Sequence, residues 1–351
     1  MNRVFLFNPE NDIALAAGRQ NFTPPKAAVQ MALSGATLPW WLGDSDDYLL
    51  LSDGDMRREW FAEVVERFGG GPRPVVSLNG LEVAELSPWG RSAYTARLFR
   101  KAGAPEPLVR RDMERADFYR SLSHRRTAMR VLHGLGFDSV TEAACLDDVR
   151  RFASRFPDFY VKAPWSSSGR GVFRGRDISE AQVAGIIRRQ GSVMLERGYD
   201  GVQDFAALYY ARGGDVEFHG YSMFFTGGAA YGGNLLLTDE EIARRIGEMA
   251  GAARLAEVRC EVGRLLAETA AAPGYEGPLG VDMLVYRSGD GFDIAPCIEV
   301  NLRYTMGFVA HGAVERGVRG RMTVTSGGDI PAGAFALSAP AGGFRFIAEV
   351  R

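Results

Sequence analysis

Two short apolar runs joined by a glycine-rich turn, between residues 280 and 303, constrain the fold of this 351-residue chain more than any other feature. The turn is Arg287-Ser-Gly-Asp-Gly291, whose glycines are typical of a tight reversal between strands. The runs therefore predict an antiparallel hairpin. Because side chains alternate between the two faces of a strand, each polar residue within these runs can be assigned to a face.

The polar residues of this hairpin form a set of hard oxygen donors. Asp282 on the first strand is expected near the end of the second, where Glu299 and Asn301 share one face. Two carboxylates and a carboxamide oxygen suit Mg²⁺, which keeps water and substrate phosphates as its other ligands. Arg303, two residues further along this face, can reach an anionic oxygen. The alternative is a strand edge whose charges point into water.

A second segment, residues 159–172, is a strand followed by a loop of small residues. The strand carries Lys162, and the loop Ser166-Ser-Ser-Gly-Arg-Gly171 lets backbone N–H groups approach phosphate oxygens closely. It is not a P-loop, because the sequence lacks GxxxxGK[ST]. Taken alone, it could also be an ordinary turn.

A third segment, residues 192–196, is a short buried-strand pattern that ends in Glu196. The polar, glycine-containing stretch after it predicts a linker between two lobes, whose backbone groups could bind a base. A simple turn between strands is the alternative.

The first 110 residues alternate between strand-like and helix-like segments, which favours a parallel sheet covered by helices. Strands are predicted at 3–7, 48–51 and 74–78, and helices at 26–33, 56–68 and 91–102. The polar loop 8–12 follows the first strand, where open α/β sheets bind ligands, although Asn and Asp are also common turn residues. Further helices are predicted over 117–134 and 239–269.

Composition excludes several classes of protein. A formal net charge of -2 provides no basic field for nucleic acid. The three cysteines, Cys145, Cys260 and Cys297, form no CxxC pair, so neither a disulfide framework nor a zinc site is expected, and a cytoplasmic location fits. No apolar stretch has the length of a signal-peptide core or a membrane span, so no membrane partner is expected.

Taken in their order along the chain, the segments 159–172, 192–196 and 280–303 resemble the ATP-grasp superfamily. In that family the nucleotide lies between two α+β lobes behind a Rossmann-like domain. The likeness covers roughly residues 123–307. It implies a mixed α/β and α+β fold with three parts: a Rossmann-like domain at 1–115, a first ATP-grasp lobe at 116–198 and a second lobe at 199–351.

The resemblance implies ATP and Mg²⁺ as cofactors and assigns residues to them. The implied nucleotide contacts are Arg125, Lys162, Ser167, Ser168, Gly169, Gly171, Glu196 and Gln203. The implied metal ligands are Asp282, Glu299 and Asn301. Two positions depart from the family: Arg125 or Arg126 replaces an early lysine, and Gln203 stands where many members have a ribose-binding glutamate.

The implied activity is that of an ATP-dependent carboxylate-amine ligase acting through an acyl phosphate, with Lys162 and Arg303 as the catalytic groups. Its substrates would be a small carboxylic acid or amino acid and an amine. A kinase on the same scaffold and a non-catalytic nucleotide-binding protein are the alternatives. The oligomeric state is left open, with a homodimer as one candidate assembly.

Overall fold

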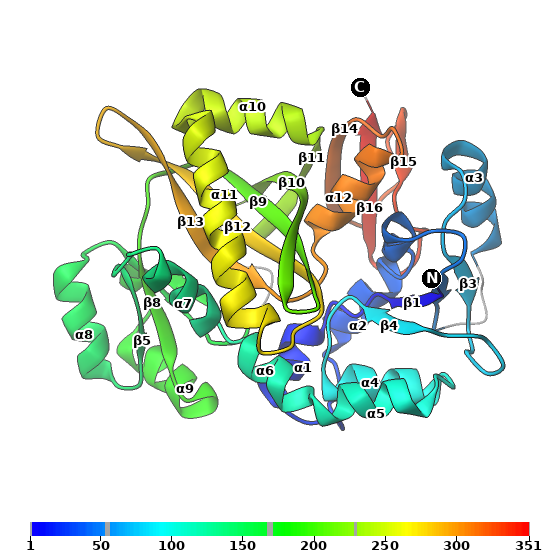
Figure 1. The fold of residues 1–351 in the computed structure, drawn as a ribbon, viewed down its shortest axis with the longest axis horizontal. Helices are drawn as coiled ribbons and strands as arrows, with labels where there is room; N and C mark the ends of the chain where they lie inside the picture. Colours follow the sequence, from blue (N-terminus) through cyan, green and yellow to red (C-terminus); the bar gives the residue numbers. More distant parts are fainter. Residues whose placement is uncertain (1, 53–56, 167–170, 228–229, 351) are drawn as a thin grey trace. The chain divides into compact units, whose positions relative to one another are not determined.

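The computed structural model describes residues 2–52, 57–166, 171–227 and 230–350. The chain forms two compact units (Figure 1). We define unit 1 as Met1–Arg120, Gly232–Asp239 and Arg303–Arg351, and unit 2 as Ser121–Tyr231 and Glu240–Leu302. Each unit therefore gathers segments that are far apart in the sequence. The three-part division with boundaries near residues 115 and 198 stays a prediction.

Unit 1 contains a parallel sheet whose strands are hydrogen-bonded in the order β3-β2-β1-β4. The strands are β1 (Arg3–Leu6), β2 (Tyr48–Leu50), β3 (Arg73–Val75) and β4 (Glu85–Pro88). The first three confirm predicted strands. The sequence pattern does not predict β4, because four residues that end in proline carry no clear apolar period. In the inner strand β1, Val4 and Phe5 are fully buried, as expected for a strand covered on both faces.

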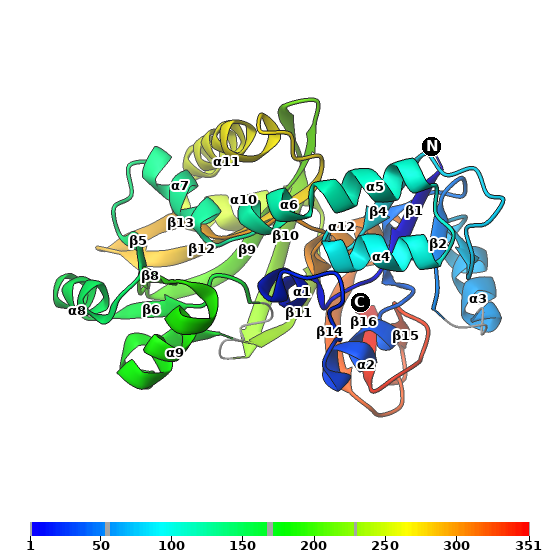
Figure 2. The same ribbon diagram turned by 90° about the horizontal axis from the view of Figure 1, so that it is seen from below.

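Helices alternate with these strands along the chain, which confirms the predicted α/β organisation. They are α1 (Asn11–Ala17), α2 (Lys26–Ser34), the short 3-10 helix Leu38–Leu42, α3 (Arg58–Phe68), α4 (Ala93–Lys101), α5 (Glu106–Glu114) and α6 (Ala116–Leu122). Figure 2 shows α4 and α5 side by side, and they contribute Phe99 and Val109 to a core with Val4 and Leu86.

Unit 1 also includes a helix and antiparallel strands from the end of the chain. The helix is α12 (Met306–Glu315), and the strands are β14 (Gly320–Ser326), β15 (Ala334–Ala336) and β16 (Phe344–Val350), together with residues 232–236 of β11 (Ala230–Leu236). They are hydrogen-bonded in the order β11-β14-β16-β15.

The first part of unit 2 is an antiparallel sheet with the strand order β5-β8-β6-β7. Its elements are α7 (Arg126–Gly134), β5 (Val140–Ala143), α8 (Leu146–Arg155), β6 (Phe159–Lys162), β7 (Val172–Arg174), the 3-10 turn Gly175–Asp177, α9 (Glu180–Gln190) and β8 (Val193–Arg197). Phe152 and Ile186, from α8 and α9, pack with Val161 and Leu195 of the sheet. The predicted strand that carries Lys162 and the predicted strand that ends near Glu196 are confirmed as β6 and β8.

The second part of unit 2 is an antiparallel arrangement in the order β13-β12-β9-β10. Its elements are β9 (Gly201–Arg212), β10 (Asp215–Gly227), α10 (Asp239–Ala250), α11 (Ala252–Leu266), the π-helical turn Ala267–Ala271, β12 (Gly277–Ser288) and β13 (Gly291–Asn301). Helix α11 packs on these strands (Figure 1), and the Tyr209 hydroxyl donates to the Arg259 carbonyl at 2.9 Å. The predicted hairpin is the pair β12 and β13.

Two predicted helices are wrong in their continuity. The segment 117–134 forms α6 and α7 instead of one helix, because the Arg125 N–H donates to the Pro164 carbonyl (3.1 Å), outside any helix. The segment 239–269 is divided into α10 and α11 at Gly251, whose φ of 91° is incompatible with a continuous helix. The first break is due to a long-range contact and the second to a backbone conformation, and neither is visible in the spacing of apolar residues.

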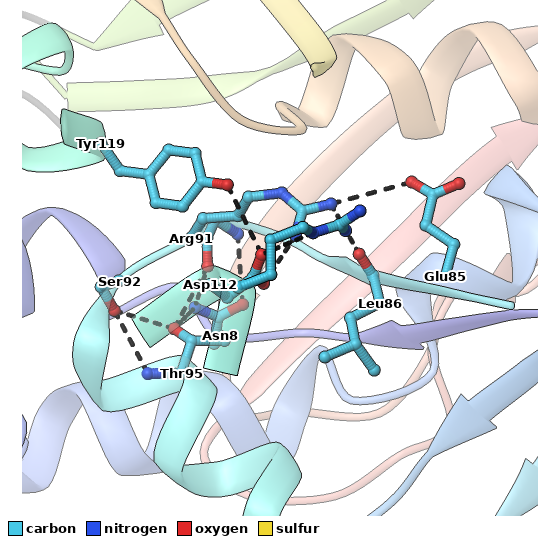
Figure 3. Close-up of polar contacts among 10 residues, drawn as sticks. Asn8, Glu85, Leu86, Arg91, Ser92, Thr95, Asp112 and Tyr119 are labelled. Atoms are coloured by element: carbon cyan, nitrogen blue, oxygen red, sulfur yellow. Dashed lines mark hydrogen bonds and ion pairs between the residues drawn. The ribbon is translucent and has the colours of Figure 1, made fainter. Parts of the chain in front are cut away.

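The side chain of Asn8 joins the loops that follow β1 and β4, as Figure 3 shows. Its Nδ2 donates to the Gly90 carbonyl (2.9 Å) and to Thr95 Oγ1 (3.0 Å), and its Oδ1 accepts from the Gly90 N–H (3.2 Å). A Cβ atom on Gly90 would lie 2.4 Å from Asn11 Nδ2, so this junction requires glycine. Asn8 therefore has a structural role in the polar loop 8–12.

A second polar cluster holds α5 and α6 against the end of β4 (Figure 3). Arg91 pairs with Asp112 at 2.6 Å and also donates to the Leu86 carbonyl at 2.6 Å. The Tyr119 hydroxyl donates to the other Asp112 oxygen at 3.4 Å. Because Asp112 is buried, its charge needs this partner, and the cluster fixes the loop after β4 from a second side.

Glu10, two residues after Asn8, is a buried carboxyl group with only 4% of its surface exposed. Among the described residues its Oε2 has no hydrogen-bond partner. Burial raises its pKa from 4.5 to about 7, and a hydrogen bond to its own backbone opposes this only in part. The folded protein therefore favours the protonated form of Glu10.

Replacement of Glu10 by Gln should change how stability depends on pH. Because the pKa of Glu10 is higher in the folded state, its favourable contribution is complete below pH 4.5 and is lost as the pH rises to about 7. The stability of Glu10→Gln relative to wild type should therefore increase by about 2 to 3 kcal/mol between pH 5 and pH 8. Urea unfolding at both pH values measures this difference. The exposed Glu82→Gln variant should show no such trend, and an unchanged difference for Glu10→Gln would contradict the assignment.

Candidate functional site

Lys162 is the last residue of β6, and its buried side chain forms an ion pair with Glu196 of β8. The two strands are antiparallel, with Tyr160 opposite Glu196, so Lys162 is the diagonal neighbour of Glu196 on the same face. The Lys162 Nζ also donates to the carbonyl of Ile298 on β13 at 3.2 Å. The structure thus brings together two residues that the sequence assigned to nucleotide binding.

The hairpin β12–β13 places Asp282 directly opposite Glu299 and Gly280 opposite Asn301. The next pair is Leu284 with Ala295, so residues 296–298 of β13 form a bulge opposite Met283 alone. Pro296 fits this bulge because it has no N–H to donate to a regular ladder. The carbonyl of Ile298 belongs to the bulge and accepts from Lys162, which connects β6 to the hairpin.

Asp282, Glu299 and Asn301 lie together on one face at the end of the hairpin. The Asn301 Nδ2 donates to Asp282 Oδ2 at 3.2 Å. Within the described ranges, no group of three or more His, Cys, Asp and Glu side chains could hold a metal ion, so a metal here would need the Asn301 oxygen and ligands from a substrate. Rotation of the amide by 180° exchanges its N for its O. The donor set of two carboxylates and one carboxamide fits Mg²⁺ with phosphate oxygens.

Arg125 connects this face to the stem of the small-residue loop. Its Nη1 lies 2.9 Å from Glu299 Oε2, its Nε donates to the Ala163 carbonyl (3.1 Å), and its Nη2 donates to Ser166 Oγ (3.2 Å). Its backbone N–H donates to the Pro164 carbonyl. The break between α6 and α7 places Arg125 where these contacts are possible, so the feature that the sequence pattern missed also positions a site residue.

The loop itself is only partly described. Ser167, Ser168 and Gly169, which the sequence assigned to phosphate binding, lie outside the described residues. Gly171 has a φ of 77° and its carbonyl accepts from the Ala163 N–H at 2.7 Å, which closes the base of the loop. Gln190 at the end of α9 accepts from the Trp165 N–H at 3.0 Å and donates to the Trp165 carbonyl at 3.4 Å. Sequence reasoning did not find Gln190, because its partner is far away in the sequence.

Arg126, the alternative to Arg125, has different partners. Its Nη2 lies 2.7 Å from Glu142 Oε1, which also accepts from Ser192 Oγ at 2.6 Å. Burial alone would raise the pKa of Glu142, but the hydrogen bonds from Ser192 and Arg126 hold it below its usual value. Of the two arginines, Arg125 is therefore the one that contacts the loop stem.

Gln203 and Arg303 have partners other than the residues described above. Gln203 is on β9, where its Nε2 donates to the carbonyls of Asp204 (2.8 Å) and Phe224 (3.1 Å). Arg303 belongs to unit 1, where it pairs with Asp12 at 3.1 Å. The predicted continuation of the second hairpin strand to Arg303 is wrong, because β13 ends at Asn301 and Arg303 forms a β-bridge with Gly90. The roles of Gln203 and Arg303 toward ligands stay predictions.

Solved structures resemble this chain, whereas sequence comparison finds no match. No family model matches the sequence, and no curated protein matches it. N5-carboxyaminoimidazole ribonucleotide synthetase from Thermus thermophilus is similar in structure, with a TM-score of 0.50 and 13% identity over 100% of this chain and 94% of that chain. The biotin carboxylase domain of Hydrogenobacter thermophilus 2-oxoglutarate carboxylase, solved with MgADP, has a TM-score of 0.49 and 12% identity over 99% and 86% of the chains.

At this level of identity the likeness concerns the fold alone. The match to the Thermus protein spans the whole of this chain, so the two share a fold. The parallel sheet of unit 1 and the antiparallel sheets of unit 2 agree with the predicted mixed α/β and α+β fold.

Proposed function

We propose that this protein is an ATP-dependent carboxylate-amine ligase that uses Mg²⁺ and forms ADP. One observation carries the proposal: Lys162 donates to the carbonyl of Ile298, the residue before Glu299. The cation at the end of the phosphate-loop strand and the oxygen donors of the hairpin therefore belong to one site within unit 2. A site that combines a cation with hard oxygen donors suits a metal-bound polyphosphate.

In this proposal, each residue has a role in binding or positioning. Lys162 supplies a point charge to the phosphates, and Ser167, Ser168, Gly169 and Gly171 stay the proposed phosphate contacts of the loop. Glu196 and Gln203 bind the adenosine part. Asp282, Glu299 and Asn301 hold Mg²⁺, which neutralises charge on the phosphate oxygens when it is bound. No protein nucleophile is required, because catalysis of this kind depends on positioning and electrostatics.

The proposed reaction has two steps. An oxygen of the substrate carboxylate attacks the γ-phosphorus of ATP, so that an acyl phosphate forms and ADP leaves. The nitrogen of the amine then attacks the acyl carbon, phosphate leaves, and the nitrogen loses a proton. A kinase on the same scaffold would stop after the first transfer, and a protein without turnover would bind nucleotide only.

We also propose that the protein acts in the cytoplasm, where ATP and small acids and amines are available. Cys145 and Cys260 are exposed free thiols, which suits a reducing compartment. In the part of the chain that the structure describes, no helix is both long and apolar enough to cross a membrane. A homodimer stays a candidate assembly that sedimentation can test.

Thermal unfolding with and without ligand tests nucleotide binding at this site. MgATP at about a hundred times its dissociation constant should stabilise wild type by roughly 2.7 kcal/mol, and GTP should stabilise it less. Glu299→Gln should reduce the MgATP effect, because the variant loses a carboxylate ligand. The double variant Lys162→Met with Glu196→Gln should also reduce the MgATP effect. It removes both charges of the buried pair, so that no unpaired charge is left in the interior. The exposed Glu276→Gln should match wild type; an equal MgATP effect in Glu299→Gln would sink the metal assignment.

The dependence of ADP release on substrates separates a ligase from a kinase. Steady ADP formation should require both an acid and an amine, and hydroxylamine can replace the amine because it traps acyl phosphates as hydroxamates. A screen of small acids with hydroxylamine should give ADP and hydroxamate in equal amounts, and Glu299→Gln should form neither. ADP release with one substrate alone, together with a stable phosphorylated product, would instead indicate a kinase.

A further inference from the structure

The guanidinium of Arg125 is paired with Glu299, one of the proposed metal ligands, in the structure described here. We propose that Arg125 is a built-in counter-cation, so that the site binds a divalent metal ion together with the nucleotide and not alone. The inference deepens the proposed function and depends on it. Arg125 is here a positioning residue that regulates metal uptake.

The first argument is the environment of Arg125. Only 9% of the residue is exposed, and three guanidinium nitrogens have partners: Glu299, the Ala163 carbonyl and Ser166. Two of these partners lie in the stem of the small-residue loop. Two hydrogen bonds hold the guanidinium on the stem side, and both would break if it turned into solvent when a metal approaches Glu299. A metal bound to Glu299 would therefore stand next to a fixed positive charge.

The second argument is electrostatic. Asp282 and Glu299 lie directly opposite each other on neighbouring strands, an arrangement in which like charges are destabilising. Arg125 neutralises Glu299, and the Asn301 amide donates to Asp282. The nearby Glu196 is neutralised by Lys162 in the same way. Each carboxylate that could attract a cation thus already has a partner, and the attraction for a bare Mg²⁺ is weak.

A nucleotide changes this balance. A triphosphate brings several negative charges, to which one N–H group of the guanidinium can turn while the others stay on Ala163 and Ser166. The forked guanidinium has five N–H donors and can exchange one partner at a time, whereas an ammonium acts as a single point charge. This property gives a physical reason for an arginine at a position where the family resemblance implies a lysine.

Binding of Mn²⁺ alone, followed by the electron paramagnetic resonance signal of the free ion, tests the inference. Wild type should bind Mn²⁺ weakly without nucleotide. Arg125→Gln should bind it at least about tenfold more tightly, because Glu299 then loses its cationic partner. The matched control Arg126→Gln, whose arginine pairs with Glu142, should behave as wild type. Arg125→Lys keeps the charge and should also bind Mn²⁺ weakly, and the added change Glu299→Gln in Arg125→Gln should abolish the gain.

Each outcome decides the question. Equal Mn²⁺ affinity in wild type and Arg125→Gln would overturn the inference, and so would tight binding of Mn²⁺ alone to wild type, which can be measured even if Arg125→Gln does not fold. Stabilisation of wild type by MgATP is scored separately. If MgATP stabilises wild type but Arg125→Gln gains no Mn²⁺ affinity, the inference fails and the proposed function stands. If MgATP has no effect, the proposed function itself fails.

Discussion

The buried ion pair between Lys162 and Glu196 is the interaction on which the organisation of unit 2 depends. Removal of two charges from water costs several kcal/mol per ion, and the cost is offset only when the geometry is good and further hydrogen bonds are made. Neighbouring antiparallel strands provide this geometry, and the Ile298 carbonyl provides the further acceptor. The pair therefore connects the sheet of the first part of unit 2 to the bulged strand of the second. Loss of one partner would leave a charge without compensation.

Charge compensation extends from this pair to the whole site. Arg125 pairs with Glu299, and Asn301 donates to Asp282. Groups that could bind phosphate and groups that could bind a cation thus hold one another before any ligand arrives. Such an arrangement keeps donors and acceptors oriented at low cost, because the side chains are already ordered. In the proposed function, phosphate and metal bind most favourably as a complex, because each frees the partner of the other.

In unit 1, polar contacts gather at the carboxyl edge of the parallel sheet. The loops after β1 and β4 meet at the carboxyl edge of the parallel sheet, where open sheets bind ligands. The hydrogen bonds of Asn8 and the Arg91–Asp112 pair connect these loops to the elements around them. Arg303 is held there by Asp12. Glu10 differs from these residues, because among the described residues its buried Oε2 has no hydrogen-bond partner. Burial therefore favours the protonated form of its carboxyl group. This edge therefore contains one group, Glu10, whose pKa is raised by burial to about 7.

Local pattern was sufficient for features that depend on neighbours in sequence: the strands β1 to β3, the hairpin β12–β13 with its turn, and the shared face of Glu299 and Asn301. Periodicity and turn chemistry act over a few residues and can be followed in one sequence. Tertiary structure decided the break before Arg125, the choice of Arg125 over Arg126, the bulge at Pro296 and the end of β13 before Arg303. These depend on partners such as Pro164, Glu299 and Gly90, which are tens to hundreds of residues away, so no local pattern encodes them.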